Sequence, residues 1–371
     1  MSAITGWAMR AGTERFRQRF ASLDPSHFRS LQDLWVSSIG LGTYLGDADD
    51  ATDGAYQDAL RTAMANGCNV IDSAINYRCQ RSERTIGRAL AAAIADKTIA
   101  RDEVLLCTKG GYVPYDGSVP DDPARYLIDV IINTGVAAYD DLVAGCHCLS
   151  PSFLAESLDT SLANLGVSTI DVYYLHNPEQ QLDEIDRDTF MQRLEAAFAW
   201  LEQRVADGQI RWYGAATWNG FRVQSRAKEY LSLEALVQLA ERVGGSQHHF
   251  RMIQLPYNLS MPEASSFKNQ TVDGESVTVL EAATRLGLSV LCSASLLQSR
   301  LTRLPQSLGA QIPGCASDAQ RAIQFVRSTP GVTTALIGMK QSAHAEENLA
   351  LAKLPVLDEA HIHHLFDRTR R

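Results

Sequence analysis

Eight short apolar runs alternate with eight longer amphipathic stretches along most of this 371-residue chain. The apolar runs, each too short for a helix, occupy residues 38–41, 69–72, 104–109, 170–176, 210–215, 252–255, 288–292 and 333–337. The amphipathic stretches occupy residues 53–65, 82–96, 151–165, 189–206, 233–243, 276–286, 317–328 and 342–352. Strands that alternate with helices form parallel sheets, and eight such units close a barrel. The sequence therefore predicts an α/β fold, a (β/α)8 TIM barrel.

Three segments fall outside the eight units: an N-terminal extension at residues 1–30, a long insert at 110–149 and an extra C-terminal helix at 357–371. The insert separates the third strand from its helix, and loops of that length at an active face tend to form lids or pocket walls. Because no low-complexity linker divides residues 31–371, we expect them to form a single domain.

Local signals mark where two of the helices begin. Ser150 is expected to cap the helix at 151–165, and Pro151 suits its first position. Ser82 is expected to cap the helix that follows the second strand in the same way.

Composition narrows the class of partner. The formal net charge of −9 does not favour binding to nucleic acid or to an anionic membrane surface. No run of 18 apolar residues, the length needed to span a membrane, is present. The seven cysteines are an odd number and lie partly in apolar runs, which favours reduced core residues and a cytoplasmic location. We therefore expect a small-molecule partner, and the sequence leaves the oligomeric state open.

Four reactive side chains stand at the ends of three successive predicted strands. Asp72 ends the second strand and Tyr77 follows five positions later, while Lys109 ends the third strand and His176 the fourth. In a barrel, the carboxyl ends of the strands meet at one face, where the chemistry takes place. We therefore expect these four groups to converge.

The motifs around these residues resemble those of the aldo-keto reductase family. They read GCNVIDSAINY, VLLCTK, DVYYLHNP, MIQLPYN and IGMKQSAHAEENL, in order and over roughly residues 35 to 352. The resemblance implies an NAD(P)H-dependent oxidoreductase that reduces an aldehyde or ketone to an alcohol. Its substrate would be a small carbonyl compound or a sugar-like molecule.

The resemblance also assigns the catalytic roles, and each role is physically reasonable. Tyr77 would donate a proton to the carbonyl oxygen while the cofactor supplies the hydride. The Lys109 ammonium would lower the pKa of the phenol, and Asp72 would hold the ammonium as its ion-pair partner. His176 would donate a hydrogen bond to the substrate oxygen.

The resemblance implies a cofactor site in the last three units. Gln254 would bind the nicotinamide carboxamide, and Glu347 with Asn348 would hold the adenine end. The other predicted cofactor-binding residues are Ser293, Gly338, Lys340 and His344.

Three departures from the family pattern bear on the cofactor. Ala216-Thr217 replaces the Ser-Asn pair that grips the carboxamide in many members, and Cys292 stands where an aromatic ring usually stacks. Trp218 or Tyr213 would then supply the ring. Lys340 and His344 are the basic residues left to bind the 2′-phosphate. Because they could serve, NADP(H) is the first choice; because they are few, NAD(H) is a competitor.

Two other functions remain open at this point. One is a dehydrogenase of the same family that oxidises a sugar or polyol with NAD. The other is a nucleotide-binding, redox-sensing regulatory subunit with little turnover, which the altered carboxamide grip favours.

Two further clusters have competing interpretations. Arg78, Arg81 and Arg84 follow Tyr77 and form either a solvated helix start or a pocket for an acidic substrate. Cys146-His147-Cys148 has the side chains of a zinc site but no second cluster at the required spacing, so no metal is expected.

Overall fold

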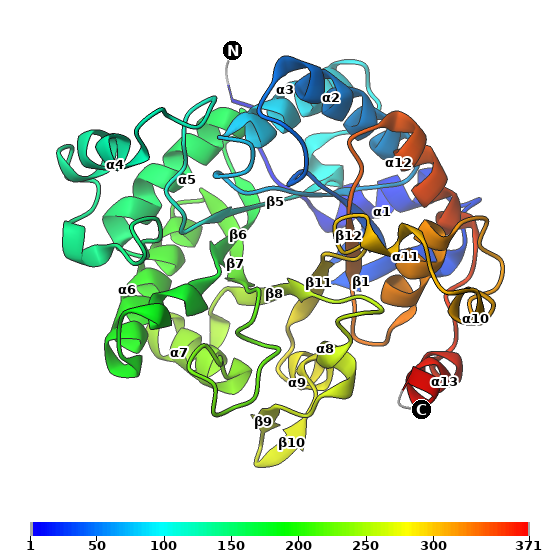
Figure 1. The fold of residues 1–371 in the computed structure, drawn as a ribbon. Coiled ribbons are helices and arrows are strands. Elements are labelled where there is room, and N and C mark those ends of the chain that lie inside the picture. Colours follow the sequence, from blue (N-terminus) through cyan, green and yellow to red (C-terminus); the bar gives the residue numbers. More distant parts are fainter. Residues whose placement is uncertain (1–2, 370–371) are drawn as a thin grey trace.

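The computed structural model describes residues 3–369, and eight parallel strands form a closed barrel at its centre (Figure 1). In chain order the strands are β3 (Ile39–Gly42), β4 (Val70–Asp72), β5 (Leu105–Gly110), β6 (Ile170–His176), β7 (Ile210–Ala216), β8 (Phe250–Pro256), β11 (Ser289–Ser293) and β12 (Thr334–Gly338). The last strand pairs with the first, Gly338 opposite Gly42, which closes the ring. The predicted TIM barrel is confirmed.

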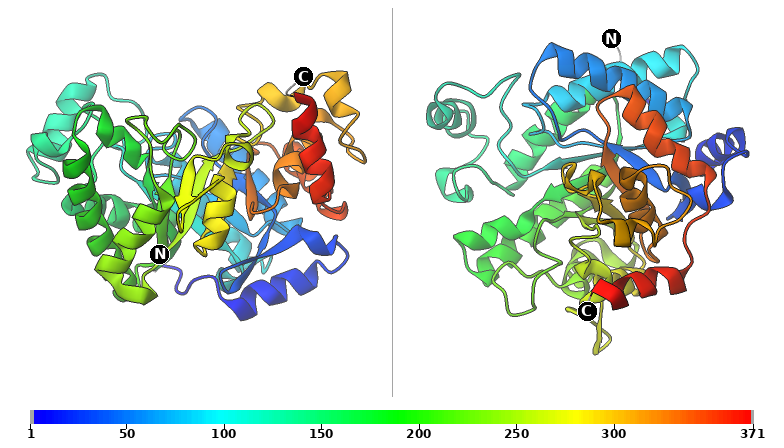
Figure 2. Two further views of the ribbon diagram at one scale, coloured as in Figure 1. Left: turned by 90° about the horizontal axis from the view of Figure 1, so that it is seen from below. Right: turned by 45° about the vertical axis from the view of Figure 1, so that its right-hand side comes forward.

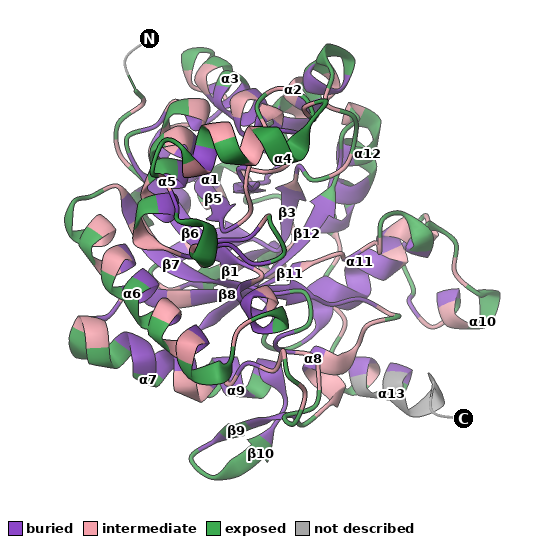
Figure 3. Ribbon diagram, turned by 60° about the vertical axis from the view of Figure 1, so that its left-hand side comes forward, coloured by how far each residue is buried: buried purple, intermediate pink, exposed green. Residues whose placement is uncertain are grey.

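Helices surround the barrel, one after each strand. They are α2 (Asp50–Ala65), α3 (Arg81–Ala95), α5 (Pro151–Leu165), α6 (Arg187–Ala206), α7 (Leu233–Gly244), α9 (Val279–Arg285), α11 (Asp318–Ser328) and α12 (Ser342–Leu349). Their buried faces pack on the outside of the strands, and their other faces are exposed (Figure 3). This two-layer arrangement is what the apolar stripes predict.

The predicted helix starts hold in one case and fail in two. Ser150 and Pro151 stand at the N-cap and first position of α5 as expected, but the Ser150 hydroxyl makes no capping hydrogen bond and instead meets Cys148 and Ser152. Ser82 does not cap α3, because the helix begins at Arg81 and the Ser82 hydroxyl donates to the Thr43 carbonyl. The stretch predicted as helix from residue 276 begins with β10 (Glu275–Val277), which pairs with β9 (Gln270–Val272), so α9 starts three residues later.

The N-terminal segment covers the end of the barrel at which the strands begin (Figure 2). It contains α1 (Arg10–Arg19) and a hairpin of β1 (Phe28–Leu31) and β2 (Leu34–Ser37). Asn69, just before β4, accepts from the Ser37 amide at 2.8 Å and donates to the Trp35 carbonyl at 3.0 Å. These bonds tie the hairpin to the barrel. Because β1 spans Phe28–Leu31, the predicted domain boundary between residues 30 and 31 falls inside this strand.

Apolar side chains of the hairpin join the interior of the barrel. Leu31, Leu34 and Val36 form one buried cluster with side chains from seven barrel strands, among them Val70 and Val172. The barrel is thus a packed core that is closed at this end.

The insert after β5 is ordered and has a small core of its own. It contains α4 (Pro123–Tyr126) and a π-helical turn (Leu127–Ile132). Ile131, Ala137 and Leu142 pack against Phe153 of α5. The insert is therefore a structured wall beside the barrel mouth.

The remaining elements are short or lie near the C-terminus. They are α8 (Glu263–Ser266), α10 (Gln306–Gly309), α13 (Glu359–Thr369) and the 3-10 turns Pro25–His27, Arg101–Glu103, Tyr139–Asp141, Pro178–Asp183, Gly245–Gln247, Arg300–Thr302 and Ala350–Lys353. The extra C-terminal helix is thus present, starting at Glu359, and the end of its predicted range, residues 370 and 371, lies outside the described residues. Within residues 3–369, no helix combines the length and apolarity needed to cross a bilayer.

Two helical glycines test how closely the outer helices pack. A Cβ on Gly87 of α3 would lie 2.6 Å from the Asn164 carbonyl oxygen of α5, whereas a Cβ on Gly54 of α2 would meet nothing within 4 Å. We expect Gly87→Ala to lower the free energy of unfolding by about 1–3 kcal/mol through overpacking. Gly54→Ala should raise it by about 0.5–1 kcal/mol, because alanine restricts the unfolded chain. Urea unfolding of both variants measures this, and changes of the same sign would contradict it.

Candidate active site

A cavity of about 450 Å³ opens at the carboxyl ends of the barrel strands. Its walls come from β8 and β12 themselves, from the ends of β3, β4, β6, β7 and β11 and the loops that follow them, and from Tyr112 of the insert. Of the four predicted catalytic residues, Asp72, Tyr77 and His176 line the cavity directly. Ligands of TIM barrels bind at this face, so the cavity is the candidate active site.

A buried ion pair lies at the base of the cavity. The Lys109 ammonium, on a residue only 1% exposed, donates to Asp72 Oδ2 at 2.7 Å and to the Ser73 carbonyl at 2.6 Å. The other carboxylate oxygen of Asp72 accepts from the Gln254 amide at 2.8 Å. Burial lowers the pKa of Lys109, but the charge of Asp72 and the nearby Tyr77 outweigh it, and the net pKa is raised. The lysine is therefore a permanent cation at neutral pH.

Tyr77 stands over this cation. The ammonium lies 4.9 Å from the centre of the phenol ring, and the rings of Tyr44 and His176 approach it edge-on at 5.0 and 5.7 Å. Burial raises the pKa of Tyr77, and the Lys109 charge offsets that rise only in part. The expected net lowering of the Tyr77 pKa is therefore wrong for this structure, because desolvation of the phenolate outweighs the ammonium.

His176 faces the cavity as a neutral imidazole. Burial, with the positive charge of Lys109, holds its pKa well below the usual value. Among the residues that the structure describes, its Nδ1 has no hydrogen-bond partner. A neutral imidazole has one N–H donor to offer, which fits hydrogen bonding to a substrate oxygen.

The insert is fastened to the strand end that carries His176, a contact that sequence reasoning missed. His147 Nε2 donates to the His176 carbonyl at 2.7 Å, and Gln181 Nε2 donates to His147 Nδ1 at 2.8 Å. Tyr112 places its ring 4.9 Å from that of His176. The only sequence signal was a histidine in an otherwise apolar part of a long insert. His147 thus serves as an anchor, and no group of three potential metal ligands occurs among the residues that the structure describes.

The predicted cofactor-binding residues divide into two sets. Gln254, Ser293 and Gly338 line the cavity. The other four lie along or just before α12, where Lys340, His344 and Glu347 are exposed and Asn348 is buried. Glu347 accepts from the Ser317 hydroxyl at 2.6 Å.

Of the two aromatic rings proposed to replace the stacking residue, one lines the cavity and the other does not. Tyr213 is fully buried and donates its hydroxyl to Glu202, outside the cavity. Trp218 is 43% exposed and lines the cavity together with Ala216 and Thr217. Trp218 is therefore the available ring. Its loop is held by Glu179, which accepts from the backbone amides of residues 218, 219 and 220.

The three arginines after Tyr77 form ion pairs away from the cavity. Arg78 is buried against Asp53, and Arg81 pairs with Asp50 and Asp53. Arg84 pairs with Asp116. None of the three lines the cavity, which argues against a pocket for an acidic substrate. Arg78 is buried, whereas Arg81 and Arg84 are partly exposed at the start of α3.

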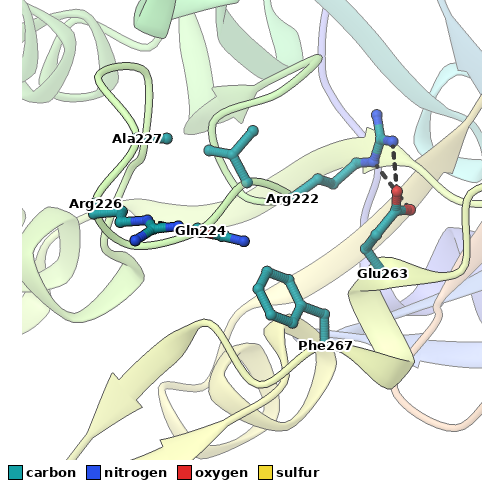
Figure 4. Close-up of a pocket in the computed structure, with 7 residues that line it drawn as sticks. Arg222, Gln224, Arg226, Ala227, Glu263 and Phe267 are labelled. Atoms are coloured by element: carbon teal, nitrogen blue, oxygen red, sulfur yellow. Dashed lines mark hydrogen bonds and ion pairs between the residues drawn. The ribbon is translucent and has the colours of Figure 1, made fainter.

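A second hollow, of about 600 Å³, lies beside the loop after β7 (Figure 4). The ion pair between Arg222 and Glu263, at 3.0 Å, crosses one side, and Phe267 forms another wall. The predicted site residues are all elsewhere, so the chemistry belongs to the first cavity.

The anchor formed by His147 predicts a dependence of stability on pH. Burial lowers the pKa of His147 from 6.5 to about 4. Between these values the unfolded chain binds a proton that the folded protein does not, so stability falls as the pH falls, by about 3 kcal/mol for this group. We expect His147→Gln to remove that part of the loss between pH 7 and 4.5.

Urea unfolding at the two pH values measures the effect. His27, whose pKa burial also lowers to about 4, gives a second, independent case: His27→Gln should reduce the loss by a similar amount. An unchanged pH dependence in the His147 variant would contradict the assignment.

Comparison with known proteins agrees with the geometry. The model of the Aldo/keto reductase family matches residues 38–366. A putative voltage-gated potassium channel subunit beta of Schizosaccharomyces pombe is 21% identical over 88% of this chain and 87% of that protein. An NADH-specific methylglyoxal reductase of Escherichia coli is 27% identical over 50% of this chain and 49% of that protein.

Solved structures share the fold. An aldo/keto reductase of Klebsiella pneumoniae, solved in complex with NADP and acetate, superposes with a TM-score of 0.61 at 22% identity, covering 93% of this chain and 95% of that one. The family match confirms the predicted class, an NAD(P)-dependent oxidoreductase that acts on carbonyl groups. The chain belongs to the aldo/keto reductase family.

Proposed function

We propose that this protein reduces a small, uncharged aldehyde or ketone to an alcohol, with Tyr77 as the proton donor. The observation that carries the proposal is the convergence of Tyr77, the Asp72–Lys109 ion pair and a neutral His176 on one cavity. A bound dihydronicotinamide supplies the hydride in this chemistry. The protein must then supply the proton and orient the carbonyl.

Each residue has a role that its surroundings support. The raised pKa keeps Tyr77 protonated at neutral pH, so the phenol is ready to donate to the carbonyl oxygen. The phenolate left behind would be stabilised by the Lys109 ammonium, which is held in place by Asp72. The N–H of His176 would orient the carbonyl oxygen beside the phenol.

The residues of the cavity fit a dinucleotide. Gln254, Ser293 and Gly338 line the cavity, and Trp218 adds an aromatic ring to its lining. In this arrangement Gln254 would bind the carboxamide, although its amide nitrogen is engaged with Asp72 and leaves its carbonyl oxygen to act as acceptor. Lys340 and His344 would meet a 2′-phosphate.

The cavity wall supports an uncharged substrate. Within residues 3–369, the one charged side chain among the lining residues is Asp72, whose two oxygens are already bonded. Tyr44, Tyr112 and Leu296 give the wall a largely aromatic and apolar character. A neutral carbonyl compound fits this surface better than an acid, because no cation is available to pair with a carboxylate.

Two alternatives each have one observation in their favour. An NAD-dependent dehydrogenase of a sugar or polyol is favoured by the single exposed lysine before α12, since a 2′-phosphate prefers several cations or an arginine. A regulatory subunit with little turnover is favoured by the length of the match to the channel subunit. Single-turnover oxidation of bound NADPH by a set of aldehydes separates the reductase from the regulatory subunit.

Replacement of the phenol tests the proton donor. We expect Tyr77→Phe to lower kcat for aldehyde reduction by roughly 10²–10⁴-fold, because the proton donor is lost. The Kd for NADPH should stay within a few-fold, since the ring remains. Steady-state kinetics and fluorescence titration measure the two effects. Tyr139→Phe makes the same chemical change on a residue that is 73% exposed in the insert, and serves as the control. Unimpaired turnover in Tyr77→Phe would remove the residue from this role.

Removal of the exposed lysine tests the choice of dinucleotide. We expect Lys340→Met to raise the Kd for NADPH by roughly fivefold to tenfold and to leave the Kd for NADH nearly unchanged, because only NADPH carries a 2′-phosphate. Lys353→Met, which removes an exposed lysine beyond α12, is the matched control. Equal effects on both dinucleotides would show that Lys340 does not distinguish them.

A further inference from the structure

The backbone directly after Tyr77 adopts a conformation that its side chains disfavour. Arg78, Cys79 and Gln80 have φ angles of 50°, 55° and 68°, three consecutive left-handed residues without a glycine. Residues with a Cβ avoid this region, and they visit it singly rather than in runs. Surrounding contacts must therefore hold this turn in place.

Arg78 makes those contacts. Its side chain, 1% exposed, runs from the turn to the loop between β3 and α2. There Nε donates to the Asp47 carbonyl at 2.8 Å, and Nη2 donates to the Asp49 carbonyl at 3.3 Å and to the Asp53 carboxylate of α2. Its guanidinium also lies 5.3 Å from the centre of the Tyr56 ring.

The loop that Arg78 grips is itself a wall of the active site. We name residues 43–49 the β3–α2 loop. Tyr44 and Leu45 of this loop line the cavity, and the Tyr44 ring lies 5.0 Å from that of Tyr77. Figure 1 shows α2 and α3, which flank the loop and the turn, packed side by side. One side chain thus joins the segment that carries the phenol to the adjacent β3–α2 loop.

We propose that Arg78 is a positioning residue, which clamps the β3–α2 loop to the strained turn and so fixes the Tyr77 phenol over Lys109. This inference rests on the proposed function, because it concerns the geometry of the same proton donor. The neighbouring arginines do not share the role. Arg88 pairs with the same Asp53 but is 51% exposed, and its bonds go to Asp53 and Thr85 rather than to the loop backbone.

The substitution Arg78→Gly distinguishes the effect of backbone strain from the effect of the side-chain contacts. Arg78→Gly relieves the left-handed backbone but removes every bond of the guanidinium. If Arg78 clamps the two segments, kcat for reduction of an aromatic aldehyde with NADPH should fall by roughly tenfold to a hundredfold, while the KM of the aldehyde and the Kd of NADPH stay within a few-fold. Guanidinium chloride at millimolar concentration should restore part of the lost kcat.

Hydrogen–deuterium exchange of the full-length protein gives a readout that does not depend on turnover. Arg78→Gly should speed exchange in peptides that cover residues 43–49 and 74–82, and Arg88→Met should change neither exchange nor kcat. Arg78→Lys, which keeps the charge but cannot reach both carbonyls and the carboxylate, should show intermediate values, and it takes the place of the glycine variant if that variant does not fold.

Unchanged exchange at residues 43–49, or a kcat within about twofold of wild type in Arg78→Gly, would overturn the inference. A failure of the proposed function looks different. In that case the wild type itself would not oxidise NADPH with any aldehyde, and the exchange experiment would still decide whether Arg78 clamps the loop.

Discussion

The buried ion pair between Asp72 and Lys109 is the interaction on which the rest of the site depends. Two charges out of water are stable only when paired and hydrogen-bonded, and loss of one partner of such a pair costs about 3–5 kcal/mol. Here β4 supplies the carboxylate, β5 the ammonium and β8, across the barrel, the Gln254 amide that satisfies the second carboxylate oxygen. The closed barrel is what brings these three strand ends together, so the fold and the charge arrangement support each other.

This charge arrangement sets the protonation of the whole site. The Lys109 cation helps to keep His176 neutral, and burial keeps the Tyr77 phenol protonated. The site therefore holds a proton on the Tyr77 hydroxyl and an uncharged hydrogen-bonding group beside it near neutral pH. A carbonyl oxygen that gains negative charge would meet donors from both groups, and the ammonium behind the phenol would stabilise the charge that the donor acquires.

The barrel and the four converging residues were predictable because each depends on a short-range pattern. A strand of a few apolar residues ends in a polar one, and the parallel order of the strands brings those ends to one face. The contacts of His147 and Arg78 were not predictable, since both bridge segments about 30 residues apart and depend on the path of a loop. The net pKa of Tyr77 was misjudged for a related reason: the sequence shows a neighbouring charge, but it does not show how deeply the phenol is buried. The start of α9 was misplaced because residues 275–277 pair with a strand of their own.

The hairpin of β1 and β2 closes one end of the barrel, and this has a consequence for kinetics. Buried side chains fill the barrel beneath the cavity, so a dinucleotide and a carbonyl compound would both have to enter through the cavity at the other end. A nicotinamide ring lying against Gln254 would sit deeper than the molecule it reduces. The dinucleotide would then have to bind first and leave last. A barrel that is open at one end therefore favours an ordered sequential mechanism.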